Sequence, residues 1–178
     1  SIAYDPSNGY LYVTNLFSAS VSVINPSNNS VIATISVGGE PEGIIYDPSN
    51  GYIYVADCGF NSVSVINPSN NSVIATINVG FGPHGIVYDP SNGYIYVTDT
   101  YSNNVSVINP SNNSVIATIS VGGEPEGIIY DPSNGYIYVA DCGFNSVSVI
   151  NPSNNSVIAT INVGFGPHGI VYDPSNGY

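Results

Sequence analysis

The sequence contains no lysine and no arginine, against 12 aspartates and glutamates and two histidines, so its formal net charge is -12. A surface of this charge repels phosphate backbones and anionic lipid headgroups, and it has no cationic side chain to release counterions from DNA. We therefore expect no nucleic-acid partner. In acid, only the two histidines and the amino terminus can become positive. Little repulsion then accumulates, and we predict an acid-stable fold that persists to about pH 2–3.

Long apolar runs are also missing. None approaches the roughly 18 residues that span a bilayer, and the first residues lack the charged-then-apolar pattern of a signal peptide. The sequence thus predicts no membrane insertion, and export would need a segment outside these 178 residues. The chain is nevertheless 43% hydrophobic with 15 tyrosines, which is too apolar for an acidic disordered protein and enough to bury a core.

What the sequence does contain is repetition. The phrase YDPSNGY stands at 4–10 and returns every 42 residues until it ends the chain at 172–178. Residues 21–94 and 105–178 are identical at all 74 positions, so the units alternate in two versions, and only the first twenty residues deviate. Terminal repeats tend to be atypical, so we expect a true beginning at residue 1 and a cut at residue 178. We predict one array over 1–178, with units at approximately 1–42, 43–84, 85–126 and 127–168 and an extra first strand at 169–178.

The unit at 43–84 shows the local pattern. GIIYD leads into DPSNG, where Pro48 presets φ for a type I turn and Gly51 supplies a positive φ. The runs YIYVAD, VSVIN and SVIATINV follow, separated by CGFNS and PSNNS, and they are rich in β-branched and aromatic residues. No stretch has a helical period. The unit therefore predicts four strands joined by three hairpin turns.

An antiparallel four-stranded unit that recurs at this spacing is typical of a β-propeller blade. The first three strands are apolar on both faces, as a blade between two neighbours requires, whereas the fourth alternates apolar residues with Thr76 and Asn78 like an outer edge strand. We predict an all-β protein, a β-propeller of four blades plus one extra inner strand. A parallel β-solenoid is the main alternative, but its rungs lack tight hairpins.

The second strand of each unit carries a short motif. It reads YVTN at 12–15, YVAD at 54–57, YVTD at 96–99 and YVAD at 138–141. Over the whole chain these motifs resemble the YVTN family of β-propeller repeats, which is related to the NHL repeats. The resemblance implies a propeller, usually of seven blades, of the kind found in archaeal and bacterial surface-layer and other exported proteins. Some relatives are lactonases or carry redox metals. An extracellular or cell-surface location is therefore expected.

Four blades are fewer than the usual ring of that family. An open arc would leave two apolar blade faces in water, a larger patch than a soluble monomer tolerates. We expect self-association or further repeats to cover these faces, either as a ring completed by a second copy or as a head-to-tail filament that uses 169–178 as a donated strand. A closed four-bladed monomer is the rival arrangement.

The linkers between units place one ionisable residue each just before the glycine that opens the next inner strand. In a propeller these positions surround the mouth of the central channel, where alternating carboxylates and imidazoles could bind a divalent metal. The alternative is that they are solvated loop residues, too far apart for one ion in a ring of seven or eight blades. We predict no other cofactor. The candidate metal ligands are Glu42, His84, Glu126 and His168.

Two further residue types occupy equivalent turns. Cys58 and Cys142 lie on alternate blades, beyond the Cα separation of about 7 Å that a disulfide allows, so they are either free thiols or links between subunits. Asp57, Asp99 and Asp141 end the second strand of their units. An Asx-type cap of the following turn is their ordinary role, and only a substrate pocket lined by them would make them catalytic.

The hairpin between the third and fourth strands contains the sequence NNS, an N-glycosylation sequon. At the outer rim of a blade a glycan would have room. The same letters also make a good hairpin turn, and both interpretations can hold together. The candidate glycosylation sites are Asn28, Asn70, Asn112 and Asn154 in NNS, with Asn104 in NVS as a fifth.

Two classes of function remain open. A non-enzymatic structural or adhesive array in a surface layer or filament is the main expectation, because a scaffold gains from identical units whereas an active site needs asymmetric ones. The alternative is a propeller enzyme, lactonase-like or redox, with its site in the central channel. The sequence predicts no catalytic residues, because a nucleophilic triad needs a serine beside a histidine and both histidines lie in repeated linkers.

Overall fold

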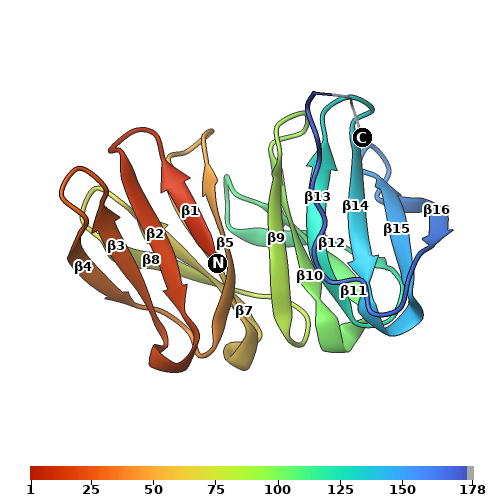
Figure 1. Ribbon diagram of the computed structural model, residues 1–178, viewed down its shortest axis with the longest axis horizontal. Coiled ribbons are helices and arrows are strands. Elements are labelled where there is room, and N and C mark those ends of the chain that lie inside the picture. Colours follow the sequence, from red (N-terminus) through yellow and green to blue (C-terminus); the bar gives the residue numbers. More distant parts are fainter. Residues whose placement is uncertain (176–178) are drawn as a thin grey trace.

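The computed structural model describes residues 1–175 as four antiparallel sheets of four strands, one sheet for each repeat (Figure 1). In every sheet the strands pair in chain order, which confirms the predicted all-β blades. The first blade holds β1 (Ile2–Asp5), β2 (Tyr10–Asn15), β3 (Ser20–Asn25) and β4 (Ser30–Ser36). The second holds β5 (Pro41–Asp47), β6 (Tyr52–Asp57), β7 (Ser62–Asn67) and β8 (Ser72–Asn78). The third holds β9 (Pro83–Asp89), β10 (Tyr94–Asp99), β11 (Asn104–Asn109) and β12 (Ser114–Ser120). The fourth holds β13 (Pro125–Asp131), β14 (Tyr136–Asp141), β15 (Ser146–Asn151) and β16 (Ser156–Asn162).

Side-chain hydrogen bonds fix the turns that the sequence predicts. Asp47 Oδ1 accepts from the backbone N and the Oγ of Ser49, at 2.8 and 2.7 Å, and the N of Gly51 donates to the carbonyl of Asp47 at 2.9 Å. Gly51 closes this turn with φ of 77°, a conformation that glycine adopts without strain. The same turn chemistry recurs in each blade, so the register of the inner hairpins is set locally.

The connection between the second and third strands is more ordered than the sequence suggests. A three-residue 3-10 helix lies there in each blade, and a residue with positive φ follows it, such as Asn61 at 54°. Asparagine tolerates this left-handed conformation better than most residues. The helices are η1 (Leu16–Ser18), η2 (Cys58–Phe60), η3 (Thr100–Ser102) and η4 (Cys142–Phe144). No helix within residues 1–175 is long and apolar enough to cross a membrane.

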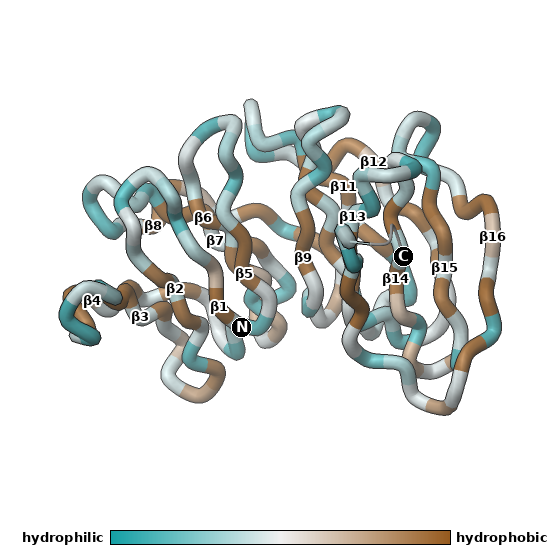
Figure 2. The backbone as a smooth tube through the Cα atoms, turned by 45° about the horizontal axis from the view of Figure 1, so that its top comes forward, coloured by the Kyte–Doolittle hydropathy of each residue, from teal (hydrophilic) through white to brown (hydrophobic). Residues whose placement is uncertain are grey.

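The core lies between the blades, because the middle strands β6, β7, β10 and β11 of the second and third blades are buried on both faces. Tyr54 packs in the cluster shared with the third blade, while Ile53 and Val55 pack in the cluster shared with the first. Each such side chain contributes about 1.5–3 kcal/mol when fully removed from water. Figure 2 shows the strands largely hydrophobic and the connecting turns largely hydrophilic. The propeller-like stacking therefore follows from two-sided burial of short strands.

The innermost strands β1, β5, β9 and β13 follow one another side by side (Figure 1). Glycines permit this close approach: a Cβ on Gly43 would overlap the carbonyl oxygen of His84, and one on Gly85 would overlap that of Glu126. At the last blade the covering neighbour is missing. Ile161 of β16 is 46% exposed, whereas the equivalent Ile119 of β12 is 4% exposed. The fourth blade thus keeps an uncovered apolar face within the described residues.

The predicted extra inner strand at 169–178 is not formed as a strand. Residues 169–173 run beside β13, where Ile170 and Val171 border a cavity, but they join no sheet within the described residues, and 176–178 lie outside them. The nearest backbone hydrogen bond is from the N of Gly127 to the carbonyl of His168, at 3.0 Å. The physical reason is that a blade's inner strand pairs with its own second strand, which this segment lacks.

Candidate functional site

The candidate metal ligands lie where the inner strands begin. Glu42, His84 and Glu126 are each the second residue of β5, β9 and β13, directly after a proline and before a glycine. His168 holds the same position in the segment that follows the fourth blade. Because glycine lets adjacent inner strands approach closely, the preceding side chains converge at one end of the row of strands.

The four side chains form a continuous row, which we call the Glu–His cluster (Glu42, His84, Glu126 and His168). His84 Nε2 lies 3.8 Å from Glu42 Oε2 and 3.0 Å from Glu126 Oε2. Glu126 Oε2 lies 3.5 Å from His168 Nε2. The two imidazole rings meet edge to face, with centroids 5.5 Å apart. The repeat therefore brings together all four residues that the sequence singled out.

The central carboxylate of the cluster is not satisfied by the protein alone. Glu126 Oε2 is buried and receives no hydrogen bond of good geometry within the described residues, although a histidine nitrogen lies 3.0 Å away. A buried oxygen in this state is costly unless a cation or a protonated imidazole compensates it. The atom thus marks the point where positive charge is needed.

The donor set fits a divalent transition metal. One ligand atom each from His84, Glu126 and His168 lies within 4.8 Å of the other two. Zinc sites place nitrogen and oxygen ligands about 2.0–2.2 Å from the ion, so atoms a few ångströms apart can share one ion after small side-chain rotations. Imidazole with carboxylate suits Zn, Cu, Fe or Ni.

More acidic groups gather at the same end. Burial, and then the charges of Glu40, Glu42 and Glu126, raise the pKa of the Cys58 thiol. Cys58 and Cys142 are both half-buried free thiols, so neither forms a disulfide within the chain. The proposed link between subunits stays a prediction. The electrostatic environment of the cluster is therefore strongly negative, which favours cations and neutral molecules over anions.

The aspartates that end the second strand of their blades, Asp57, Asp99 and Asp141, do not cap the turns that follow them, so the predicted Asx-type role was wrong. Asp57 and Asp99 are fully buried, and the 3-10 helices that follow them have no side-chain cap. Instead Asp57 Oδ2 accepts from Ser64 Oγ at 2.6 Å, and its carboxylate also accepts from the backbone of Gly38 in the preceding linker. Burial raises the pKa of Asp57 and of Asp99 to about 6, and it also raises the pKa of Asp141.

These buried carboxylates hold the preceding linkers to the strands. A Cβ on Gly38 would lie 2.6 Å from the carboxylate carbon of Asp57, so only glycine fits at this position of the linker. Sequence reasoning missed this role because the partner glycine comes from the neighbouring repeat. The signal that could have revealed it is the invariant spacing between each aspartate and the preceding GG or GF pair.

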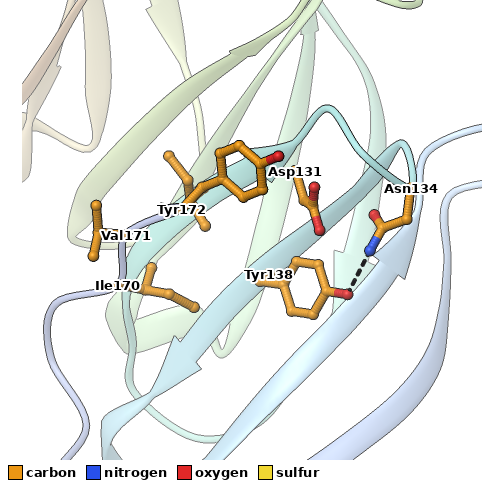
Figure 3. Close-up of a pocket in the computed structure, with 7 residues that line it drawn as sticks. Asp131, Asn134, Tyr138, Ile170, Val171 and Tyr172 are labelled. Carbon is orange, nitrogen blue, oxygen red and sulfur yellow. Dashed lines mark hydrogen bonds between the residues drawn. The ribbon is translucent and has the colours of Figure 1, made fainter. Parts of the chain in front are cut away.

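A separate cavity of about 420 Å³ lies at the fourth blade (Figure 3). Its lining includes Tyr138, whose hydroxyl accepts from Asn134 Nδ2 at 2.9 Å, together with Asp131, Ile170, Val171 and Tyr172. The equivalent tyrosine of the first blade, Tyr12, is instead buried in the cluster between blades one and two. The cavity is therefore the space that a following blade fills elsewhere in the array.

The candidate glycosylation sites fall into two environments. Four of them sit exposed at the hairpins that precede β4, β8, β12 and β16, whereas Asn104 is half-buried at the first residue of β11. The four exposed residues are Asn28, Asn70, Asn112 and Asn154.

Comparisons with known proteins support the repeat family and the fold. A family model for the NHL repeat matches residues 82–108, so this stretch of the chain is similar to an NHL repeat, as the sequence motifs predict. No curated protein matches the chain. Among solved structures, hydrazine synthase of Kuenenia stuttgartiensis superposes with a TM-score of 0.89 at 22% identity, over 98% of this chain and 52% of that one. The chain is a β-propeller repeat array.

Two lyase structures are also similar. A streptogramin B lyase matches with a TM-score of 0.84 at 16% identity, over 98% of this chain and 59% of that one. A catalytically inactive histidine-to-alanine variant of virginiamycin B lyase from Staphylococcus aureus, solved with quinupristin, matches with a TM-score of 0.80 at 17% identity. The match covers 95% of this chain and 59% of that one. The chain thus spans little more than half the length of these relatives. At such identities the likeness shows the fold alone.

The expectation of a non-enzymatic surface-layer or adhesive array was wrong. Several structures that share this fold over nearly the whole chain are enzymes, and no comparison points to a surface layer or a filament. Exact repetition does not exclude an active site, because the side chains that meet at the start of the inner strands come from different repeats. Four equivalent positions there carry glutamate and histidine in alternation, which supplies the asymmetry that an active site needs.

Proposed function

We propose that this chain forms part of a β-propeller enzyme whose reactive centre is the Glu–His cluster, with one divalent transition-metal ion bound by His84, Glu126 and His168. The observation that carries the proposal is the convergence of three ligand atoms, from three repeats, within 4.8 Å. The buried, uncompensated oxygen of Glu126 supports it, because a bound cation would remove its desolvation cost.

Charge composition supports a metal as the electrophile. Enzymes stabilise developing negative charge with Arg or Lys side chains, backbone N–H groups or metal ions. This chain has no Lys and no Arg, so a metal ion, a protonated histidine or backbone N–H groups would serve at the cluster. A metal also lowers the pKa of a bound water and polarises a carbonyl oxygen.

We assign the role of general base to the remaining member of the cluster, Glu42. Glu42 Oε2 lies 3.8 Å from His84 Nε2, at the edge of the proposed metal site, and its side chain is about one-third exposed. A carboxylate so placed can remove a proton from a bound substrate or water. The supported reaction class is metal-assisted elimination or hydrolysis of an ester or lactone. The negative surroundings favour a neutral or cationic substrate.

The similar lyases add weight to an elimination reaction. One of them is inactive after replacement of a histidine by alanine, so a histidine is essential on that propeller. In the present chain the two histidines are His84 and His168, and both belong to the cluster.

Titration of the full chain with Zn²⁺ alone in a calorimeter tests the metal site. We expect one ion per chain, and at least about 100-fold weaker binding in His84→Ala and Glu126→Gln, because loss of a ligand costs more than loss of a supporting residue. Glu124→Gln is the matched control, since Glu124 is an exposed linker carboxylate two residues away. Equal binding by all variants would overturn the assignment.

Activity is tested by incubating metal-loaded protein with neutral and cationic lactones. Hydrolysis adds the mass of one water to the product, whereas elimination opens a cyclic ester without changing its mass, so mass spectrometry separates the two reactions. We expect Glu42→Gln to lose turnover and to keep Zn²⁺ binding. Metal binding without turnover on any ester or lactone would contradict the reaction class and leave a metal-binding propeller.

A further inference from the structure

The outer strand of each blade presents an unprotected edge. The strands β4, β8, β12 and β16 end their sheets, so one side of each backbone has no strand partner within the described residues. On β4, Val31 is 59% exposed and Ile32 is 45% exposed, and the same pair is exposed on the other three outer strands. Exposed apolar edge strands pair with other chains, and proteins commonly guard them with lysine. This sequence has none.

The turn that precedes each outer strand holds an asparagine in a shared geometry. Asn28 Oδ1 accepts from the backbone N of Ser30 at 3.1 Å and from Ser30 Oγ at 2.7 Å. The residue between them, Asn29, has φ of 56°, which turns the chain back and leaves Asn28 on the outside. Within the described residues Asn28 Nδ2 donates to no protein atom. The same two bonds recur at Asn70, Asn112 and Asn154.

We propose that these four asparagines are N-glycosylation sites and that their glycans cover the Val–Ile edges of the outer strands. The sequon hydroxyl already contacts the asparagine side chain, while the amide nitrogen that must react belongs to an exposed residue and donates to no protein atom within the described residues. Each acceptor lies three residues before the exposed valine, so a bulky polar glycan would stand over the apolar edge. The inference is independent of the metal site, which lies at the inner strands.

The chemistry is a single group transfer. Asn28 Nδ2 attacks the anomeric carbon of an oligosaccharide carried on a polyprenyl pyrophosphate by an oligosaccharyltransferase. The new C–N bond forms as the bond from that carbon to the phosphate oxygen breaks. The lipid pyrophosphate leaves with the bonding electron pair, and the amide proton passes to a base of the transferase.

The fifth sequon provides an internal contrast. Asn104 Nδ2 donates to the carbonyl of Ser102 at 3.4 Å, and Asn104 Oδ1 is buried. Asn104 begins the central strand β11, where its backbone lies opposite Asp99 of β10 and Ser120 of β12. Its sequon serine, Ser106, donates instead to the buried carboxylate of Asp99 at 2.7 Å. Asn104 is therefore not an acceptor, although its three-letter sequence qualifies.

The test is secretion of the whole chain through a host with N-glycosylation, followed by intact mass measurement. We expect up to four glycans above the 18.6 kDa polypeptide. Enzymatic release converts each occupied asparagine to aspartate and so marks the site for peptide mapping. Chymotrypsin supplies the peptides, because a chain without Lys or Arg gives trypsin nothing to cut.

Variants separate the proposal from a general effect on folding. Ser114→Ala should remove one glycan and Ser114→Thr should restore it, while Ser111→Ala in the same turn and Asn104→Gln should change nothing. A bare polypeptide mass for the secreted chain would overturn the proposal, as would occupancy of Asn104. The enzymatically deglycosylated protein should aggregate faster than the glycosylated form in light scattering; equal rates would overturn the edge-covering role.

Discussion

Thr98 in the third blade donates a hydrogen bond from Oγ1 to the backbone carbonyl of Glu126 in the fourth, at 2.8 Å. The same oxygen accepts from the backbone N of Gly85 at 2.7 Å, so one hydroxyl joins β9, β10 and β13. Thr14 holds the carbonyl of Glu42 in the same way, at 3.0 Å. The blades that precede the two histidines carry alanine at this position, Ala56 and Ala140. The carbonyl of each glutamate of the cluster is thus held by a threonine hydroxyl, whereas alanine offers no hydroxyl to the carbonyl of either histidine.

Replacing Thr98 by valine should loosen the carboxylate that completes the metal site. The substitution keeps the β-branched shape and removes the hydroxyl, so the carbonyl of Glu126 loses a donor. We expect Zn²⁺ affinity to fall by about 10–100-fold, the usual cost of losing a supporting hydrogen bond. Calorimetric titration measures it. Thr118→Val on an exposed outer strand is the control, and an unchanged affinity in Thr98→Val would contradict a positioning role.

The buried aspartates should make the fold more stable in mild acid than at neutral pH. The folded pKa of Asp57 and Asp99 is about 6, above the ordinary value of 3.8, because burial disfavours the charged carboxylate. The folded state therefore binds more protons than the unfolded state between these values. The contribution of these carboxylates to the free energy of unfolding is therefore fully present below about pH 4, and it is lost as the pH rises through about 6. The loss is on the order of 2–3 kcal/mol for each carboxylate.

Urea unfolding at several pH values tests this dependence, and the first blade suggests the control. There Asn15 replaces the aspartate, and its Nδ2 donates to Ser22 Oγ at 2.9 Å. The double variant Asp57→Asn, Asp99→Asn should therefore fold and should show a flatter profile between pH 4 and 7. If wild type unfolds at lower urea concentration at pH 4.5 than at pH 7, the buried carboxylates do not behave as described.

The identical glycines Gly85 and Gly169 should differ in their tolerance of alanine. Both stand in GFGPHGIVYD, but a Cβ on Gly85 would overlap the carbonyl oxygen of Glu126, whereas one on Gly169 would meet nothing within 4 Å. We expect Gly85→Ala to cost about 1–3 kcal/mol through overpacking against backbone, and Gly169→Ala to cost little. Chemical denaturation measures both. Equal costs would mean that a further blade or copy packs on residues 169–173.

Self-association is the remaining prediction, and it concerns the uncovered face of the fourth blade. Tyr138 there borders a cavity and Ile161 is exposed, so burial against another blade would gain free energy. We expect the isolated chain to form dimers or larger species in size exclusion with light scattering. Deletion of residues 169–178 should abolish them if that segment contributes a strand. A single species near 18.6 kDa would refute the prediction.

Much of the fold could be predicted from the sequence because its determinants are local. The 42-residue period defines the blades, and turns such as Asp47–Gly51 are encoded by residues whose side chains bond within the turn. Two-sided apolar strands require neighbours on both faces, which indicates a propeller. The spacing of Glu42, His84, Glu126 and His168 also follows from the repeat. The sequence by itself therefore determined which residues are equivalent.

Only the tertiary structure decided which equivalent residues meet. The distance from His84 to Glu126 depends on how closely β9 and β13 approach, and that depends on contacts such as the one between Gly85 and the Glu126 carbonyl. The buried carboxylate of Asp57 accepts a hydrogen bond from the backbone of Gly38 and so holds the preceding linker in place. Gly38 belongs to the preceding unit, so no pattern within one unit encodes this contact. Asn104 and Asn112 share a sequon but differ in burial and hydrogen bonding, since one begins a central strand and the other a rim turn. Local sequence fixes dihedral angles and periodicity, whereas distance, burial and charge environment arise from residues that only packing brings together.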